Sequence, residues 1–139
     1  MTYKEKVSYL SSYRRLVQEC NELQDEIIRL GHKKERMGTS FPKMPENVSM
    51  DKKSALEELT IAIDELETRL KTRSAVYGDL LDSIEDAINQ VPDPKDQQLL
   101  RLRYIYGYTF QRIAEKMYYT DKQYASKVHK RILNKYDFN

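Results

Sequence analysis

The sequence predicts an all-α protein with two parts, an N-terminal antiparallel coiled-coil hairpin over residues 1–91 and a C-terminal helix-turn-helix domain over residues 92–139. Two patterns predict this fold: apolar residues repeat every seven positions in the first part, and two short amphipathic helices follow each other closely near the end. Only 4 Gly and 4 Pro occur among 139 residues, which also favours helices. A chain of this length holds one or two small domains.

The first expected helix has an apolar seam with the period of 3.5 residues that is typical of coiled coils. One core position is filled by Tyr9, Leu16, Leu23, Leu30 and Met37, and the complementary position by Tyr13, Cys20, Ile27 and Lys34.

The second expected helix covers about 40 residues up to Val91, and its seam alternates steps of three and four residues. Arg73 alone interrupts it. Together with Cys20 and Lys34, this arginine either sets the register of the coiled coil or extends its polar end into solvent. The apolar seam consists of Leu56, Leu59, Ile63, Leu66, Leu70, Tyr77, Leu80, Ile84, Ala87 and Val91.

A loop over residues 38–50 joins the two helices. Gly38 is expected to stop the first helix, Pro42 and Pro45 block its continuation, and Ser49 caps the next helix. A long arm of two helices buries only one seam on each, so we expect it to associate with a second copy as a homo-oligomer.

The C-terminal part begins at Pro92, where Asp93 can cap a helix that has Pro94 in its first position. That helix runs to Tyr106, and Gly107 provides a turn. Thr109 is expected to cap the next helix and Thr120 the last one. The inward residues of these last two helices are Phe110, Ile113, Ala114 and Met117, then Tyr124, Val128 and Ile132.

The last helix presents a polar, basic side to solvent. Residues 95–139 carry a net charge of +6, whereas residues 51–91 carry −5. Lys and Gln can contact base edges in the major groove, and Lys also neutralises phosphates. The pattern therefore favours double-stranded DNA as partner, although an ordinary helical hairpin with a solvated basic face has the same pattern. The outward residues are Lys122, Gln123, Ser126, Lys127 and Lys130.

The C-terminal sequence also resembles a known family. Residues 100–117, followed by Thr120, Tyr124 and His-Lys-Arg-Ile-Leu at 129–133, resemble region 4 of sigma-70-type transcription factors. The segment 84–136 is more similar still to phage and prophage late-gene regulators of Firmicutes, the ArpU-like and RinA-like proteins. The resemblance implies promoter binding and contact with host RNA polymerase.

The same resemblance implies roles for single residues. Bases would be read by Lys122, Gln123 and Ser126, next to Thr120, whereas the phosphate backbone would lie near Thr109, Gln111 and Arg112. A tyrosine hydroxyl in the turn, from Tyr118 or Tyr119, either contacts a phosphate or remains in solvent. Two positions depart from the family: Tyr118 stands where a glycine is common, and Tyr124 where a small aliphatic residue is common.

The sequence favours no enzyme, metal site or cofactor. His32 and His129 have no ligand partners at metal-binding spacing and are expected at the surface or at a helix end, and Cys20 is expected in a helix core. No apolar run could span a membrane, and no secretion signal begins the chain, so we expect a cytoplasmic protein. The alternatives to a sequence-specific regulator are an adaptor that docks on RNA polymerase and an oligomeric phage structural or packaging protein that binds DNA without specificity.

Overall fold

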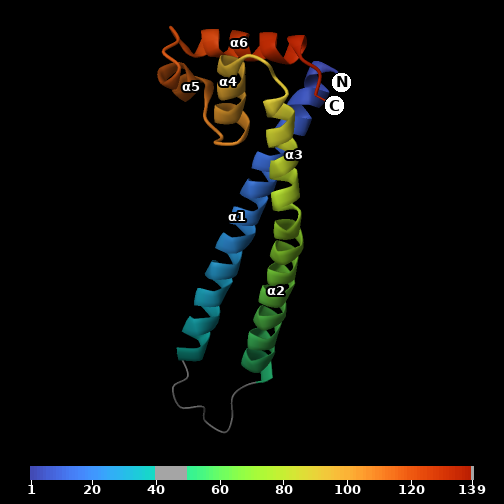
Figure 1. Ribbon diagram of the computed structural model, residues 1–139. Coiled ribbons are helices and arrows are strands. Elements are labelled where there is room, and N and C mark those ends of the chain that lie inside the picture. Colours follow the sequence, from blue (N-terminus) through green and yellow to red (C-terminus); the bar gives the residue numbers. More distant parts are fainter. Residues whose placement is uncertain (40–49, 139) are drawn as a thin grey trace. The chain divides into compact units, whose positions relative to one another are not determined.

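The computed structural model describes residues 1–39 and 50–138, and within them the protein has six helices and no strands (Figure 1). The prediction of an all-helical protein is therefore confirmed. Most of the expected loop, with Pro42, Pro45 and Ser49, lies outside the described residues. The helices are α1 (Tyr3–Thr39), α2 (Met50–Ala75), α3 (Tyr77–Asn89), α4 (Pro94–Tyr104), α5 (Phe110–Lys116) and α6 (Lys122–Lys135).

The chain divides into two compact units. Unit 1 comprises Met1–Val17 and Val76–Asn139, and unit 2 comprises Gln18–Ala75. This division differs from the boundary expected after residue 91, because α3 and the first turns of α1 pack with the C-terminal helices in one core. A three-helix domain of this size buries little apolar surface, and α3 and the first turns of α1 enlarge its core.

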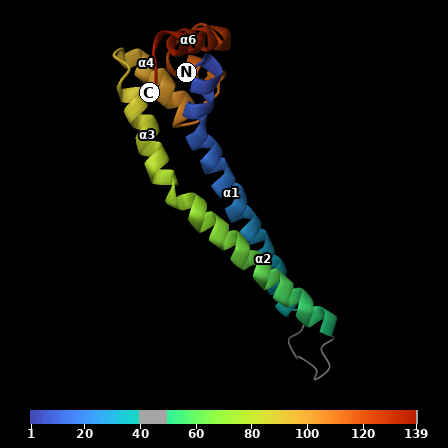
Figure 2. The ribbon, with the colours of Figure 1, turned by 90° about the vertical axis from the view of Figure 1, so that its right-hand side faces the viewer.

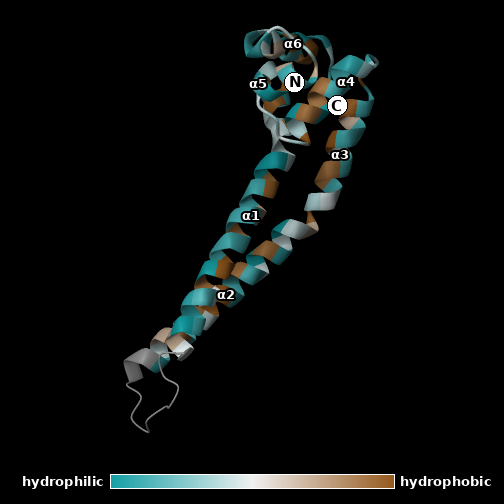
Figure 3. Cartoon of the chain, turned by 90° about the vertical axis from the view of Figure 1, so that its left-hand side faces the viewer, coloured by the Kyte–Doolittle hydropathy of each residue, from teal (hydrophilic) through white to brown (hydrophobic). Residues whose placement is uncertain are grey.

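Unit 2 contains the end of α1 together with α2. α1 continues one residue beyond Gly38, where it was expected to stop. Leu23 and Leu30 of the predicted heptad series are buried. Hydrophobic positions recur along α2 among polar ones (Figure 3). Among the described side chains of α2, however, none is fully buried, so its apolar stripe keeps partial access to solvent.

The prediction of one continuous helix up to Val91 is wrong, because the helix is interrupted at Val76. This residue lies between α2 and α3 with φ −92° and ψ −6°. Ser74 and Gly78 lie two residues before and after Val76, and all three are weaker helix formers than Ala or Leu. Tyr77 then packs on Tyr13, with 2.9 Å between their hydroxyl oxygens. This contact anchors the start of α3 inside unit 1.

The polar residues of the predicted seam point to solvent. Arg73, in the last turn of α2, forms an ion pair with Glu19 at 3.1 Å while both side chains remain substantially exposed. Lys34 is exposed as well, and Cys20 is partly buried. Of the two alternatives, solvent exposure therefore holds for Arg73 and Lys34.

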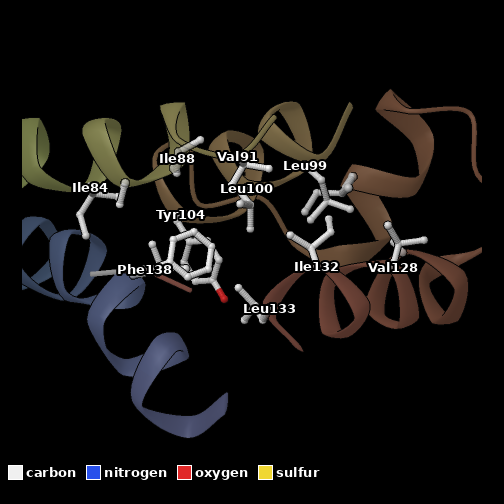
Figure 4. Close-up of a cluster of buried hydrophobic side chains, with 14 of the residues drawn as sticks. Ile84, Ile88, Val91, Leu99, Leu100, Tyr104, Val128, Ile132, Leu133 and Phe138 are labelled. Carbon is white, nitrogen blue, oxygen red and sulfur yellow. The ribbon is translucent and has the colours of Figure 1, made fainter. Parts of the chain in front are cut away.

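The core of unit 1 joins apolar residues from α1, α3, α4, α5 and α6. In Figure 4, side chains of α3 and α4 point toward those of α6, and Phe138 closes the cluster beside Ile84. Both ribbon views place the beginning of α1 beside the C-terminal helices (Figures 1 and 2). The fully buried side chains with the largest volumes are Phe138, Leu10, Ile84, Ile88, Leu99, Leu100, Ile113, Ile132, Leu133 and Val91.

A buried lysine connects the start of α1 to the end of α6. The Lys6 ammonium donates a hydrogen bond of 2.6 Å to the carbonyl oxygen of Leu133, and it lies 3.5 Å from the Asp137 carboxylate. Carbonyl groups in the last turn of a helix have no partner within the helix, and a cation there also complements the helix dipole. Lys6 thus caps α6 from a helix at the other end of the sequence.

We predict that Lys6→Met lowers the stability of unit 1 by about 1–3 kcal/mol, because a buried carbonyl loses its donor while the apolar stem is retained. All 11 tyrosines of the chain lie in unit 1, so tyrosine fluorescence during urea unfolding reports this unit. The matched control is Lys4→Met, since Lys4 is exposed on the same helix. Equal losses in both variants would contradict the capping role.

Candidate nucleic-acid interface

The start of α5 follows the sequence prediction. Gly107 has a φ of +73°, a conformation that glycine adopts without a steric penalty. The chain then extends to Thr109, whose hydroxyl accepts a hydrogen bond of 3.2 Å from the backbone N–H of Arg112. Thr109 is therefore the N-cap of α5, as predicted, and it is exposed at the molecular surface.

The turn between α5 and α6 is tight and strained at one residue. Tyr118 has a φ of +57° and is 94% exposed. A side chain in this left-handed region costs on the order of 1 kcal/mol, which explains why glycine suits the position. The next residue, Tyr119, donates its backbone N–H to the carbonyl of Ala114 at 2.9 Å and so closes the end of α5.

The predicted cap of α6 is wrong by one residue. Asp121, not Thr120, is the N-cap, and its carboxylate accepts a hydrogen bond of 2.8 Å from the backbone N–H of Tyr124. An aspartate is as good a cap as threonine or better, and its negative charge also complements the positive end of the helix dipole. Thr120 is an exposed residue of the turn.

The buried side of α6 also differs from the prediction. Val128 and Ile132 are buried as expected, but Tyr124 is 46% exposed, and its ring lies edge-on to Tyr119 at 5.0 Å. Ala125 is fully buried, as its small size predicts for a close crossing of α5 and α6 at which a tyrosine ring would not fit. The buried side is completed by His129 and Leu133.

This rotation of the buried side changes which residues of α6 point furthest from the core. At about 100° per residue, the positions opposite the buried stripe are Gln123, Lys127, Lys130 and Asn134. Ser126 is exposed at the flank of this face, and Lys122 is exposed as the first residue of the helix. We call these six residues the outer face of α6. Asn134 was not predicted, although the spacing of three and four residues from Gln123 through Lys127 and Lys130 leads to it.

The ten predicted interface residues all reach the surface, and nine of them are exposed. Tyr119 is half-buried. Gln111 donates to Glu115 at 3.4 Å, and the Arg112 guanidinium lies 4.3 Å from the centre of the Tyr108 ring. The exposed nine are Thr109, Gln111, Arg112, Thr120, Lys122, Gln123, Ser126, Lys127 and Lys130.

The charge of α6 has a single sign. The helix carries five basic side chains and no acidic one, namely Lys122, Lys127, Lys130, Arg131 and Lys135. Arg131 was not predicted as an interface residue. It lies 3.8 Å from the buried carboxylate of Asp96 on α4, so part of its charge is compensated within unit 1.

The sequence predicts that His129 lies at the surface or at a helix end. This prediction is wrong, because His129 is buried in unit 1. Its Nε2 atom is hydrogen-bonded to the Tyr104 hydroxyl at 2.5 Å, and the ring of Phe110 lies edge-on to it. Burial, together with the nearby charge of Arg103, lowers the pKa of His129 from 6.5 to about 4. Burial also raises the pKa of Tyr104 well above its ordinary value. Both side chains are therefore neutral near pH 7.

No helix in the described part of the chain is long and apolar enough to cross a membrane. Within residues 1–39 and 50–138, no three His, Cys, Asp or Glu side chains gather as a metal site would require. Comparisons with protein-family models, with curated proteins and with solved structures give no significant match to this chain.

We predict that unit 1 loses stability below pH 6.5 because the unfolded chain binds a proton at His129, whereas the buried site in the folded protein disfavours the protonated imidazole. A folded-state pKa below the unfolded value means that stability is complete above pH 6.5 and falls toward pH 4, by up to about 1.4 kcal/mol per pH unit. Urea unfolding followed by tyrosine fluorescence at pH 7 and pH 4.5 measures this change.

The variant His129→Gln should show a smaller loss of stability between these two pH values than the wild-type protein. The control is His32→Gln, because His32 is exposed and lies in unit 2. If His129→Gln does not fold, NMR of the wild-type imidazole replaces it. An imidazole of His129 that is protonated at pH 5.5 in the folded protein would refute the prediction.

Proposed function

We propose that this protein is a sequence-specific regulator of transcription that binds double-stranded DNA, with the outer face of α6 in the major groove. By the sequence resemblance described above, it would be encoded by a phage or prophage. The observation that carries the proposal is the combination of five basic side chains, no acidic ones and an outward Gln123 on a helix whose opposite side is buried. Such a helix can present amide and ammonium donors to base edges while its core side fixes its orientation.

The neighbouring helix supports this proposal. α5 and α6 pack together, with Ala114 and Ala125 both buried in the core of unit 1, and are joined by the short turn at Tyr118, an arrangement in keeping with a helix-turn-helix. Thr109, Gln111 and Arg112 are exposed at the beginning of α5. In the proposed complex they contact the phosphate backbone beside the groove that α6 occupies.

Unit 2 is proposed to pair with its counterpart in a second copy of the chain. Ile28 and Ile61 are 50% and 57% exposed, and the described part of α2 has no fully buried side chain. Pairing would bury this apolar surface, with a gain of about 25 cal/mol per Å². Two copies would also bring two DNA-binding units to one target, so that a symmetric site with two half-sites is expected.

We predict that Lys127→Gln weakens binding to every duplex about fivefold at 0.15 M salt, because one phosphate contact is lost and the salt dependence of log K falls by about 0.9. The target is first obtained by selecting genomic fragments with the purified protein, and affinities are then measured by fluorescence anisotropy. Gln123→Ala should instead reduce the preference for the selected site over a scrambled duplex.

The matched control is Lys71→Gln, which removes the same charge from an exposed position in unit 2. Equal effects of Lys71→Gln and Lys127→Gln would show that only the net charge matters. Equal affinity of the wild-type protein for all duplexes would instead favour a non-specific structural or packaging role. Capture of RNA polymerase without DNA, by a protein that binds no duplex, would favour the adaptor.

We predict that the wild-type protein has the mass of a dimer or a larger oligomer by light scattering at a protein concentration of tens of micromolar. Ile61→Glu should shift this mass toward the monomer, because a buried carboxylate opposes pairing. Lys71→Glu, on the same helix, should leave it unchanged. Far-UV circular dichroism checks that each variant keeps its helices. A monomeric wild-type mass would exclude pairing through unit 2.

A further inference from the structure

A groove of about 500 Å³ opens in unit 1 on the side of α6 that carries His129. Its floor is the buried pair Tyr104 and His129, and its walls are the half-buried rings of Tyr3 and Phe110. This volume lies within the range of roughly 300–1,000 Å³ that is typical of small-molecule sites. The outer face of α6 does not line it, so the proposed DNA contacts leave the groove without an assigned role.

The charged residues that line the groove are all positive. Lys4, Arg15 and Arg103 line it, and no carboxylate is among the lining residues. The two groups of the floor, Tyr104 and His129, are neutral near pH 7, so they do not offset this charge. A ligand with a negative group is therefore favoured over a neutral or cationic one.

Arg15 and Arg103 each have more N–H donors than their hydrogen bonds within the protein use. The Arg103 guanidinium stacks on the Phe110 ring at 4.0 Å and donates through one nitrogen to the carbonyl of Tyr108 at 3.1 Å. Arg15 uses one nitrogen for the carbonyl and hydroxyl of Ser8. Each guanidinium has five N–H groups, so both retain donors that suit a carboxylate.

The walls select for shape as well as charge. Tyr3 and Phe110 both lie edge-on to the His129 ring, with centroid distances of 6.3 Å and 5.2 Å. A flat ring placed against Tyr3 and Phe110 would gain offset or edge-to-face contacts and bury apolar surface. Val7 adds an aliphatic contact from α1.

We infer that this groove is a binding site for a small aromatic carboxylate, whose ring packs against Tyr3 and Phe110 and whose carboxylate pairs with Arg15 and Arg103. The site combines residues from α1, α4, α5 and α6, so an occupant would connect the start of α1 to the helix proposed to contact DNA. This inference does not depend on DNA binding, because none of the six residues of the outer face of α6 lines the groove, although the Lys130 ammonium lies 6.0 Å from the centre of the Tyr3 ring.

The test uses indole-3-acetate with the full chain and no DNA. The protein contains no Trp, so indole emission reports the ligand alone, and the tyrosines of the groove can transfer excitation to it. We expect saturable binding with a dissociation constant below about 1 mM. Tryptamine, which has the same ring and a positive group, should bind at least about tenfold more weakly because it meets the same cations.

Arg15→Gln should lower the affinity for indole-3-acetate at least about fivefold, since this substitution removes one of the two partners of the carboxylate. The matched control, Lys71→Gln, removes one positive charge from unit 2 and should have no effect. Urea unfolding by tyrosine fluorescence establishes that Arg15→Gln is folded. A second readout is NMR, in which the Tyr3 and Phe110 ring resonances of the wild-type protein should shift on binding.

Four outcomes would overturn the inference. The first is equal binding of indole-3-acetate and tryptamine, and the second is an equal effect of Arg15→Gln and Lys71→Gln. The third is a change in the oligomeric mass of Arg15→Gln without a change in ligand affinity, because the groove would then be covered by a second copy of the chain. The absence of binding up to 1 mM would overturn it as well.

Discussion

The hydrogen bond from Lys6 to the Leu133 carbonyl joins residues that are 127 positions apart in the sequence. It lies at the point where the first turns of α1 complete a core that α4, α5 and α6 would leave open on their own. A buried ammonium is costly unless it is paired, so this contact forms only when both helices are in place. The proposed interface on α6 therefore depends on a segment that precedes it by more than a hundred residues.

The buried side and the outer face of α6 have different roles. The core side is fixed by Ala125, Val128 and Ile132, whereas the outer face keeps its lysines free of carboxylate partners on the same helix. His129 belongs to the buried side and connects α6 to Tyr104 of α4. Its neutral state ties the stability of this contact to pH, and its position makes it part of the groove beside α1.

Unit 2 and unit 1 differ in how well they bury their apolar residues. Unit 1 has a core with many fully buried side chains, but in the described part of unit 2 the best buried apolar residues are Leu23 and Leu30. An arm with so little interior gains little stability from its own packing. This difference is the physical reason for assigning DNA contact to unit 1 and self-association to unit 2.

The sequence by itself determined the helices and several of their ends. Asp93 and Thr109 are caps because a short polar side chain before an amphipathic segment satisfies free N–H groups locally. Gly107 has a positive φ because the turn requires it. The exposure of Lys127 and its neighbours follows from the same helical period.

Only the tertiary structure decided which side of α6 is buried, where the long helix is interrupted and where His129 lies. Tyr124 and Ala125 both fit an amphipathic pattern, and the close contact with α5 selects the smaller residue. Val76 fits a helix, but the contact of Tyr77 with Tyr13 favours a new start of α3. Such choices depend on contacts between residues far apart in the chain, and local propensity and periodicity contain no information about these contacts.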